Sequence, residues 1–180
     1  MKNIFKVISL LVIVIIYTGC AQKAETGKMI AQKTDFTYEE NLKNNIDVGI
    51  VSGGRDTNPM GASQIDNYSF KEAILISLKN EGLYQENSQY RLEVTIVNFN
   101  QPLFGLDMTV GMNVQYTLID DKTGKIIWRE FIAESFTAKV SDALAGIERL
   151  KLANEGAARK NIQGLLKKLS KYKVKNIAIN

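Results

Sequence analysis

The sequence lacks histidine altogether and has a single cysteine among its 180 residues. The absence of histidine excludes Ser-His-Asp and Cys-His nucleophiles, histidine-ligated zinc and an imidazole pH switch. One cysteine excludes an internal disulfide and a thiolate metal cluster. The hydrophobic fraction of 45% and the charged fraction of 23% are those of an ordinary globular protein with one domain and a short appendage. We therefore assign no catalytic residue, no metal site and no cofactor from the sequence.

Residues 1–19 have the features of a secretory signal peptide, which is removed from the mature protein. Lys2 and Lys6 form a basic start, and residues 8–16 are almost wholly aliphatic. This apolar stretch is shorter than the roughly 20 residues that a transmembrane helix needs. The pattern therefore predicts cleavage rather than a membrane span.

The sole cysteine closes the apolar stretch, and Tyr17-Thr18-Gly19-Cys20 resembles a bacterial lipobox. The resemblance implies that the signal is cut before Cys20, that the Cys20 thiol receives a diacylglycerol, and that the new N-terminus is acylated with a chain such as palmitate. Tyr17 departs from the aliphatic residue that is commoner at its position. The alternative is an unmodified cysteine at the end of a plain signal peptide.

Lipidation of Cys20 would attach the protein to a membrane, because two or three acyl chains anchor a protein stably. The resemblance favours the periplasmic side of the outer membrane over the inner membrane, since Ala21-Gln22 lacks the aspartate that retains lipoproteins in the inner membrane of enteric bacteria. Of the 23 basic residues, two lysines belong to residues 1–19, which leaves 21 basic and 19 acidic residues. That near balance gives no indication of a nucleic-acid partner. From the lipobox we expect the membrane, and an envelope protein or lipid of unknown identity, as partners.

Residues 20–45 are polar and have no sustained apolar period. We interpret them as the lipidated cysteine followed by a flexible tether, in front of a single α+β domain over residues 46–180. The alternative is that residues 29–38 pack onto the domain.

The hydrophobic pattern of residues 46–180 predicts six elements in the order β-α-β-β-β-α. Strict alternation of apolar and polar side chains over residues 108–118 excludes an amphipathic helix there. Residues 120–124 indicate a hairpin turn with Gly124 in a left-handed conformation. The strands are expected at residues 46–51, 90–96, 108–118 and 125–138.

Two helices are expected between and after these strands. The first, of about 12 residues, begins at a capping box, Ser69-Phe70-Lys71-Glu72, and stops at Gly82. The second begins at Ser141-Asp142 and has an apolar stripe that includes Leu144 and runs to Leu169. Three glycines within it indicate close packing or a bend: Gly146, Gly156 and Gly164.

This order predicts a two-layer α+β fold in which two helices cover one face of a four-stranded, mostly antiparallel sheet. The first two strands should be parallel, because a helix joins them by a crossover, and the last three should form a meander. The layout behind a lipobox resembles the LptE and YajG type of periplasmic lipoprotein. Stretches such as GGRDTNPMGASQI and QPLFGLDMTV resemble a group of uncharacterised bacterial lipoproteins. LptE-like proteins plug and chaperone a lipopolysaccharide export barrel, but none of their functional residues maps onto this chain.

Two loops contain the candidate residues for a ligand or partner. Arg55, Asp56 and Asn58 lie in the polar loop of residues 53–65, which has neither the GxxxxGK[ST] nor the GxGxxG pattern of a phosphate loop. The alternative for this loop is a local Arg55–Asp56 pair that orders a turn. Phe104 lies in a second loop, between strands, that is more apolar than a connection needs. This loop either covers the core or faces a partner.

Two further charged groups have simpler interpretations. Glu130 and Glu134 would lie on one face of a strand, about 13 Å apart along the chain, and we interpret them as exposed cross-strand salt pairs rather than a catalytic pair. A group of lysines near the C-terminus is either a solvated face or attracted to anionic lipid: Lys167, Lys168, Lys171, Lys173 and Lys175.

The leading hypothesis is a non-enzymatic, lipid-anchored binding or assembly module of the cell envelope that faces the periplasm. One alternative is an envelope hydrolase with carboxylate or Ser/Lys chemistry, which predicts a deep pocket that gathers such groups. Another is a lipid-binding carrier, which predicts an apolar groove enclosed by the sheet and helices.

Overall fold

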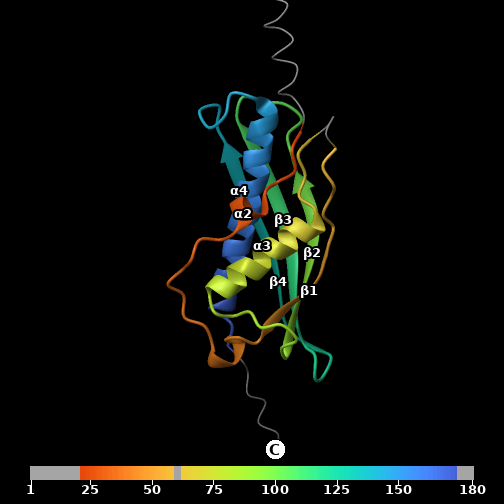
Figure 1. The fold of residues 1–180 in the computed structure, drawn as a ribbon, viewed down its shortest axis with the longest axis vertical. Helices are drawn as coiled ribbons and strands as arrows, with labels where there is room; N and C mark the ends of the chain where they lie inside the picture. The colour runs from red at the N-terminus through yellow and green to blue at the C-terminus, as the bar shows by residue number, and fades with distance from the viewer. Residues whose placement is uncertain (1–20, 59–61, 174–180) are drawn as a thin grey trace, which may run out of the picture.

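The computed structural model describes residues 21–58 and 62–173, which form a two-layer α+β fold (Figure 1). One layer is a four-stranded sheet in the order β1-β2-β3-β4, and the helices pack on one of its faces. The expected fold class is therefore confirmed. The principal elements are β1 (Ile46–Ser52), α3 (Asn67–Asn80), β2 (Tyr90–Asn100), β3 (Met108–Asp120), β4 (Lys125–Ala138) and α4 (Gly146–Leu169).

The sheet has the predicted pairing. β1 runs parallel to β2, whereas β2–β3 and β3–β4 are antiparallel, and β3 and β4 pair from Met108–Ala138 to Asp120–Lys125. The alternating side chains of β3 are buried on the helix side, as the period of two predicts. The opposite face of the sheet is open, with Thr109, Phe131 and Thr137 exposed on it.

A glycine directs the chain out of β1. Gly53 has a φ of +84°, and a Cβ built on it would lie 2.0 Å from the carbonyl oxygen of Ile96 in β2. Only glycine tolerates both the left-handed backbone and this close approach. The loop of residues 53–65 therefore leaves the sheet at the end where β2 also finishes.

Helix α3 begins earlier than the sequence predicts. Its N-cap is Asp66, whose carboxylate accepts hydrogen bonds from the Ser69 N–H (2.7 Å) and the Ser69 hydroxyl (2.8 Å). The expected cap, Ser69, is instead inside the first turn. Asp66 precedes Ser69 by three residues, which is the spacing at which a cap side chain reaches a free amide. The predicted stop is confirmed, since Gly82 has a φ of +68°.

Helix α4 begins later than predicted. Asp142 accepts a hydrogen bond from the Lys139 N–H at 2.8 Å and so closes a turn, and the helix starts only at Gly146. Leu144, expected on the apolar stripe of the helix, is therefore in a loop and 92% exposed. Within the helix, a Cβ at Gly156 would lie 2.3 Å from the Phe136 ring. The glycine there indicates close packing against β4.

A buried asparagine joins α4 to the sheet. Asn161 accepts a hydrogen bond from the Tyr116 hydroxyl at 2.8 Å and donates to the carbonyl oxygens of Met112 and Ile132, both at 3.0 Å. Burial raises the pKa of Tyr116 well above its usual value. Every polar atom of this inner contact has a partner, which fixes how the helix lies across β3 and β4.

Residues 21–45 do not form the flexible tether that we expected. They pack across the helix layer and include a short helix, α2 (Thr26–Met29), and a 3-10 turn, η1 (Glu40–Leu42). Met29 and Leu42 are fully buried in the hydrophobic core. The alternative, in which residues 29–38 pack onto the domain, is the correct one. The sequence hides this packing because an irregular segment buries side chains without a regular period.

The molecule is elongated and has two different ends (Figure 1). At one end, which we call the Ala21 end, the described chain begins and three connections meet: residues 53–65, 101–107 and 139–145. At the other, the hairpin end, lie the β3–β4 turn and the end of α4.

Candidate functional site

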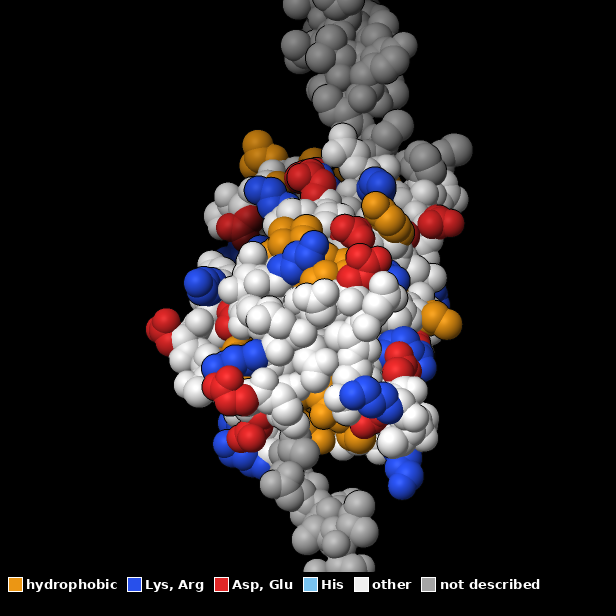
Figure 2. All heavy atoms as spheres, turned by 60° about the horizontal axis from the view of Figure 1, so that its bottom comes forward, with side chains coloured by type: hydrophobic (Ala, Val, Ile, Leu, Met, Phe, Trp, Pro, Cys, Tyr) orange, Lys and Arg blue, Asp and Glu red, His pale blue; other side chains and the backbone are white. Residues whose placement is uncertain are grey.

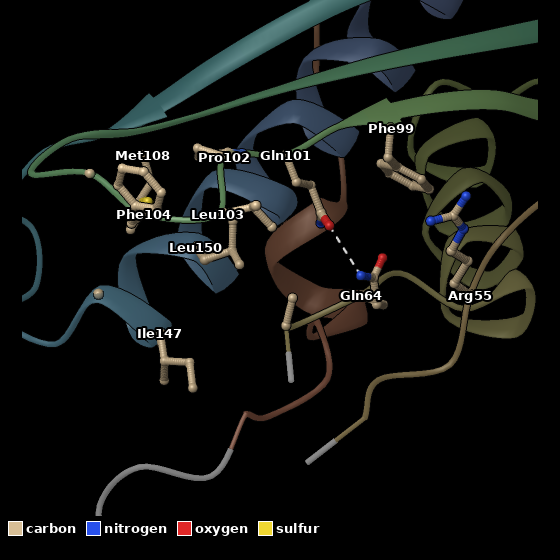
Figure 3. A pocket seen from close by; sticks show the side chains of 13 residues that line it. Arg55, Gln64, Phe99, Gln101, Pro102, Leu103, Phe104, Met108, Ile147 and Leu150 are labelled. Carbon is tan, nitrogen blue, oxygen red and sulfur yellow. Dashed lines mark hydrogen bonds between the residues drawn. The ribbon is translucent and has the colours of Figure 1, made fainter. Parts of the chain in front are cut away.

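A pocket of about 760 Å³ opens at the Ala21 end (Figure 3). Three segments form it: the loop of residues 53–65, the β2–β3 loop and the start of α4. The apolar walls consist of Phe99, Leu103, Phe104, Met108, Ile147 and Leu150. Arg55 is the charged residue of the lining, and Gln64 and Gln101 are its amides. A space of this size with few polar groups is typical of a ligand site.

A chain of amide side chains joins the three walls. Gln64 donates from Nε2 to Gln101 Oε1 at 3.0 Å, the hydrogen bond drawn in Figure 3, and Gln101 donates to Asn154 Oδ1 at 2.6 Å. Asn154, fully buried on α4, in turn donates to the Ser63 carbonyl at 2.7 Å. Gln64 Oε1 is buried and has no partner within the described structure. The network therefore leaves one buried acceptor without a hydrogen bond.

A buried arginine holds the two apolar loops together. Arg149 donates from Nη1 to the carbonyl oxygens of Ala143 and Leu144, both at 2.7 Å, and from Nη2 to the Gly105 carbonyl at 3.4 Å. A further bond runs from the Val140 N–H to the Asp107 carboxylate at 3.0 Å. The β2–β3 and β4–α4 loops are therefore fixed to each other as one unit.

This unit presents large apolar side chains to solvent. Leu103 is 95% exposed, Phe104 85% and Leu106 80%, and Leu144 from the other loop is exposed to a similar extent. The sequence left open whether the β2–β3 loop covers the core or faces outward. Phe99 packs partly on the core, whereas the residues from 103 to 106 face outward.

The structure brings some of the predicted candidates together and separates others. Arg55 and Phe104 line the same pocket, although they are about 50 residues apart in the sequence. Asp56 and Asn58 are exposed and do not line it. The side chains of Arg55 and Asp56, both described, form no ion pair with each other. The Arg55 backbone N–H donates to the Ile65 carbonyl at 2.9 Å. The idea of a local Arg–Asp pair is therefore wrong.

Cys20, the predicted lipidation site, lies outside the described residues. The next residue is informative, because Ala21 is only 6% exposed. Three residues further on, the Ala24 N–H donates to the Gln64 carbonyl at 3.2 Å. The chain that follows Cys20 is thus attached directly to the loop that lines the pocket.

The two glutamates of β4 have another role than predicted. Glu130 faces α4 and pairs with Lys168 Nζ at 2.9 Å, and Glu134 lines a groove beside Gly164 with Lys167 and Lys168. The expected cross-strand pairing is therefore wrong, because register with the buried residues of β3 turns both side chains toward the helix layer.

The lysines at the C-terminal end of α4 are partly neutralised. Besides Lys168, Lys173 pairs with Glu39 at 2.6 Å. On the face in Figure 2, which turns the hairpin end forward, basic and acidic side chains are interspersed. Lys175 lies outside the described residues. The four described lysines, at positions 167, 168, 171 and 173, are at the opposite end from Ala21, which favours the solvated interpretation over contact with the lipid that would hold Cys20.

Sequence reasoning missed Gln64, Gln101 and Arg149. Each lies in a segment that was interpreted only as loop or solvated helix face. Each also has a partner far away in the sequence: Gln64 and Gln101 are 37 residues apart, Gln101 and Asn154 are 53 apart, and Arg149 and Gly105 are 44 apart. A single sequence has no local signal for such contacts. The apolar composition of the β2–β3 loop was the one clue to this end of the molecule.

Residues 21–58 and 62–173 contain no group of three or more Cys, Asp or Glu residues that could hold a metal ion. None of their helices is both long enough and apolar enough to cross a bilayer.

Comparisons with known proteins show the fold. No protein-family model and no curated protein sequence matches the chain. A candidate lipoprotein from Caulobacter crescentus CB15 has a TM-score of 0.51 at 17% identity, over 70% of this chain and 88% of that one. A DUF330 protein from Xanthomonas campestris has a TM-score of 0.53 at 11% identity, over 76% and 91%. A hypothetical protein from Chlamydia trachomatis has a TM-score of 0.53 at 9% identity, over 72% and 97%.

At these identities the similarity concerns the fold alone. It agrees with the expected likeness to uncharacterised bacterial lipoproteins. The likeness to LptE and YajG stays a prediction.

Proposed function

We propose that this protein is a lipid-anchored binding or assembly module of the bacterial cell envelope, without catalytic activity. Acyl chains on Cys20 would hold the domain to the membrane, on the periplasmic side and in the outer membrane where the cell has one. The observation that carries the proposal is the lipobox-like stretch ending at Cys20, followed four residues later by Ala24, which is buried in the core and whose N–H donates to the Gln64 carbonyl. A segment that docks so soon after its cysteine would hold the folded domain close to the lipid surface.

The pocket at the Ala21 end is the proposed binding site. Its apolar walls suit an aliphatic or aromatic portion of a ligand, and the Arg55 guanidinium suits an anionic group. The hydrolase alternative expects a pocket that gathers Asp, Glu, Ser or Lys. Among the described residues that line this pocket, Arg55 is the sole titratable one, which favours binding over hydrolysis.

Metabolic labelling tests the anchor. Cells that express the full chain are grown with an alkyne analogue of palmitate, and the purified protein is coupled to a fluorophore. We expect label on the wild-type protein, recovery in the membrane fraction, and loss of both in C20A. An unlabelled wild-type protein in the soluble fraction contradicts the proposal. Undiminished label on C20A would place the acylation elsewhere and overturn the role of Cys20.

The apolar lining specifically favours a second candidate, a carrier that holds a lipid in the pocket. Native mass spectrometry of the purified protein would then detect a retained amphiphile. I147W fills the pocket and should abolish retention, whereas I126W, an isoleucine-to-tryptophan change at the hairpin end, should not. Equal retention by the two variants would exclude the pocket as the lipid site.

A further inference from the structure

We propose that the two apolar loops of the Ala21 end insert into the lipid surface that holds Cys20, so that the domain stands end-on on the membrane. The inserted side chains are Leu103, Phe104 and Leu106 from the β2–β3 loop and Leu144 from the β4–α4 loop. The inference rests on the proposed lipidation of Cys20 and adds to it a second membrane contact and an orientation.

These four side chains are almost wholly exposed. Four large apolar residues, each at least four-fifths exposed, belong to two loops that meet at one end of the molecule. Scattered apolar residues on a surface are ordinary, but a convergent group at a loop tip indicates a protein or membrane contact. Residues 103–106 include no charged side chain, so insertion desolvates no charge at that tip.

Hydrogen bonds hold the two apolar loops in fixed positions. The guanidinium of Arg149 is buried and bonded to carbonyl groups of both loops, and the Asp107 carboxylate accepts from Val140 N–H between them. These contacts satisfy the loop backbone while the leucine and phenylalanine side chains point away from it. Had these side chains served only to cover the core, the loops would fold them inward.

The position of Cys20 favours a lipid over a protein as the occupant. Ala24 belongs to the hydrophobic core and its N–H donates to the Gln64 carbonyl, and Cys20 precedes it by four residues, which span at most about 14 Å. An acylated Cys20 therefore leaves only a short link between the Ala21 end and the bilayer. The two loops share that end with the start of the described chain (Figure 1). The surface that they meet first is lipid.

The flanking charges fit a shallow insertion. Lys139 and Asp142 are exposed at the base of the β4–α4 loop, and Asp142 accepts from the Lys139 N–H. At headgroup depth such groups stay hydrated while the leucine tips reach the acyl boundary. We therefore expect Leu103 and Leu144 to penetrate and the base of the loops to stay at the headgroups.

A fluorescent probe on the full lipidated chain tests the proposal. Acylated Cys20 has no free thiol, and the sequence has no other cysteine, so L103C offers one site for a nitrobenzoxadiazole label. Leu103 is almost wholly exposed, so this change leaves the core intact. The matched control is T123C in the β3–β4 turn, at the hairpin end. Both proteins are reconstituted into vesicles of phosphatidylethanolamine and phosphatidylglycerol, with and without spin-labelled acyl chains.

We expect the L103C probe to shift its emission to the blue in vesicles and to lose more than half of its intensity to spin-labelled lipid, while the T123C probe does neither. Protein that floats with the vesicles but keeps an aqueous L103C probe overturns the insertion and leaves the anchor intact. Protein that does not float contradicts the anchor itself, and with it this inference. Quenching of both probes would mean that the domain lies flat, which also overturns the end-on orientation.

Discussion

Asp66 shows how a single carboxylate sets the start of a helix. Its side chain accepts from the backbone and the hydroxyl of Ser69. Burial acts to raise the pKa of Asp66, but the hydrogen bonds from Ser69 outweigh it, and the net pKa is lowered. A carboxylate with a lowered pKa in the folded state stabilises the fold above its unfolded pKa, and this stabilisation is lost as the pH falls through the folded pKa.

We therefore expect D66A to reduce the free energy of unfolding by about 1 kcal/mol at pH 7. The difference from wild type should shrink below about pH 4, as Asp66 itself becomes protonated. Urea unfolding of both proteins at pH 7 and pH 3 measures this difference in the free energy of unfolding. D66N serves as the control, because asparagine also caps helices and should cost little at either pH. A D66A deficit that is the same at both pH values would contradict this account of the cap.

At the scale of elements, close packing of α4 on β4 depends on the missing side chain of Gly156. A methyl group there would overlap the Phe136 ring. Alanine favours an isolated helix by up to about 1 kcal/mol over glycine, but forced overpacking costs about 1–3 kcal/mol. We expect G156A to lower the thermal midpoint. The control is G27A in α2, where a Cβ meets nothing within 4 Å and the change should be neutral or stabilising. A G156A protein as stable as G27A would show that the helix shifts freely.

The strands were the elements most open to prediction. β4 has the predicted bounds, because a turn marks its start and alternation with period two continues from Trp128 onward, after an irregularity at Ile127. The start of α4 was not predictable in the same way. Ser141-Asp142 has the composition of a helix cap, but Asp142 bonds to the preceding Lys139 instead. Local composition does not distinguish a turn from a cap when the same side chain can accept in both directions.

The sequence indicated which loops have unusual residues, but not that these residues meet in one pocket. Phe104 and Arg55, both singled out from the sequence because their loops are unusual for simple connections, line the pocket. Their meeting in one pocket depends on β1 and β2 running parallel and ending at the same end of the sheet. From the sequence, Arg149 was interpreted as part of a solvated helix face. Its hydrogen bonds to the carbonyl oxygens of residues 105, 143 and 144 exist only once the two loops have folded against the helix.

At the scale of the whole molecule, residues 21–45 are attached through a buried charge. Lys151 on α4 donates to Glu25 at 2.6 Å and lies 4.0 Å from Glu155, whose pKa is raised by burial. The Glu25 N–H also donates to Glu155 at 2.9 Å. The N-terminal segment thus begins its path across the helices at a small network of three charged residues, Glu25, Lys151 and Glu155.

Replacing Lys151 should loosen this segment without unfolding the domain. In K151A the buried Glu155 loses its cation, so we expect the segment to detach more often and trypsin to cut after Lys23 and Lys28 about tenfold faster. Timed proteolysis with mass spectrometry of the fragments measures the rates. K122A, an exposed lysine-to-alanine change in the β3–β4 turn, should leave them unchanged. Equal rates in wild type and K151A would mean that other contacts hold the segment.

The docking of residues 21–45 also has a mechanical consequence. A lipid anchor pulls on the chain at Cys20, and the load first reaches contacts between the N-terminal segment and the helices, not the hydrogen bonds of the sheet. The segment should therefore peel before the domain yields. Its 25 residues, once released, would span about 25–30 Å as a flexible chain. Residues 21–45 are thus folded at rest, and under tension they can detach and lengthen the link between the anchor and the domain.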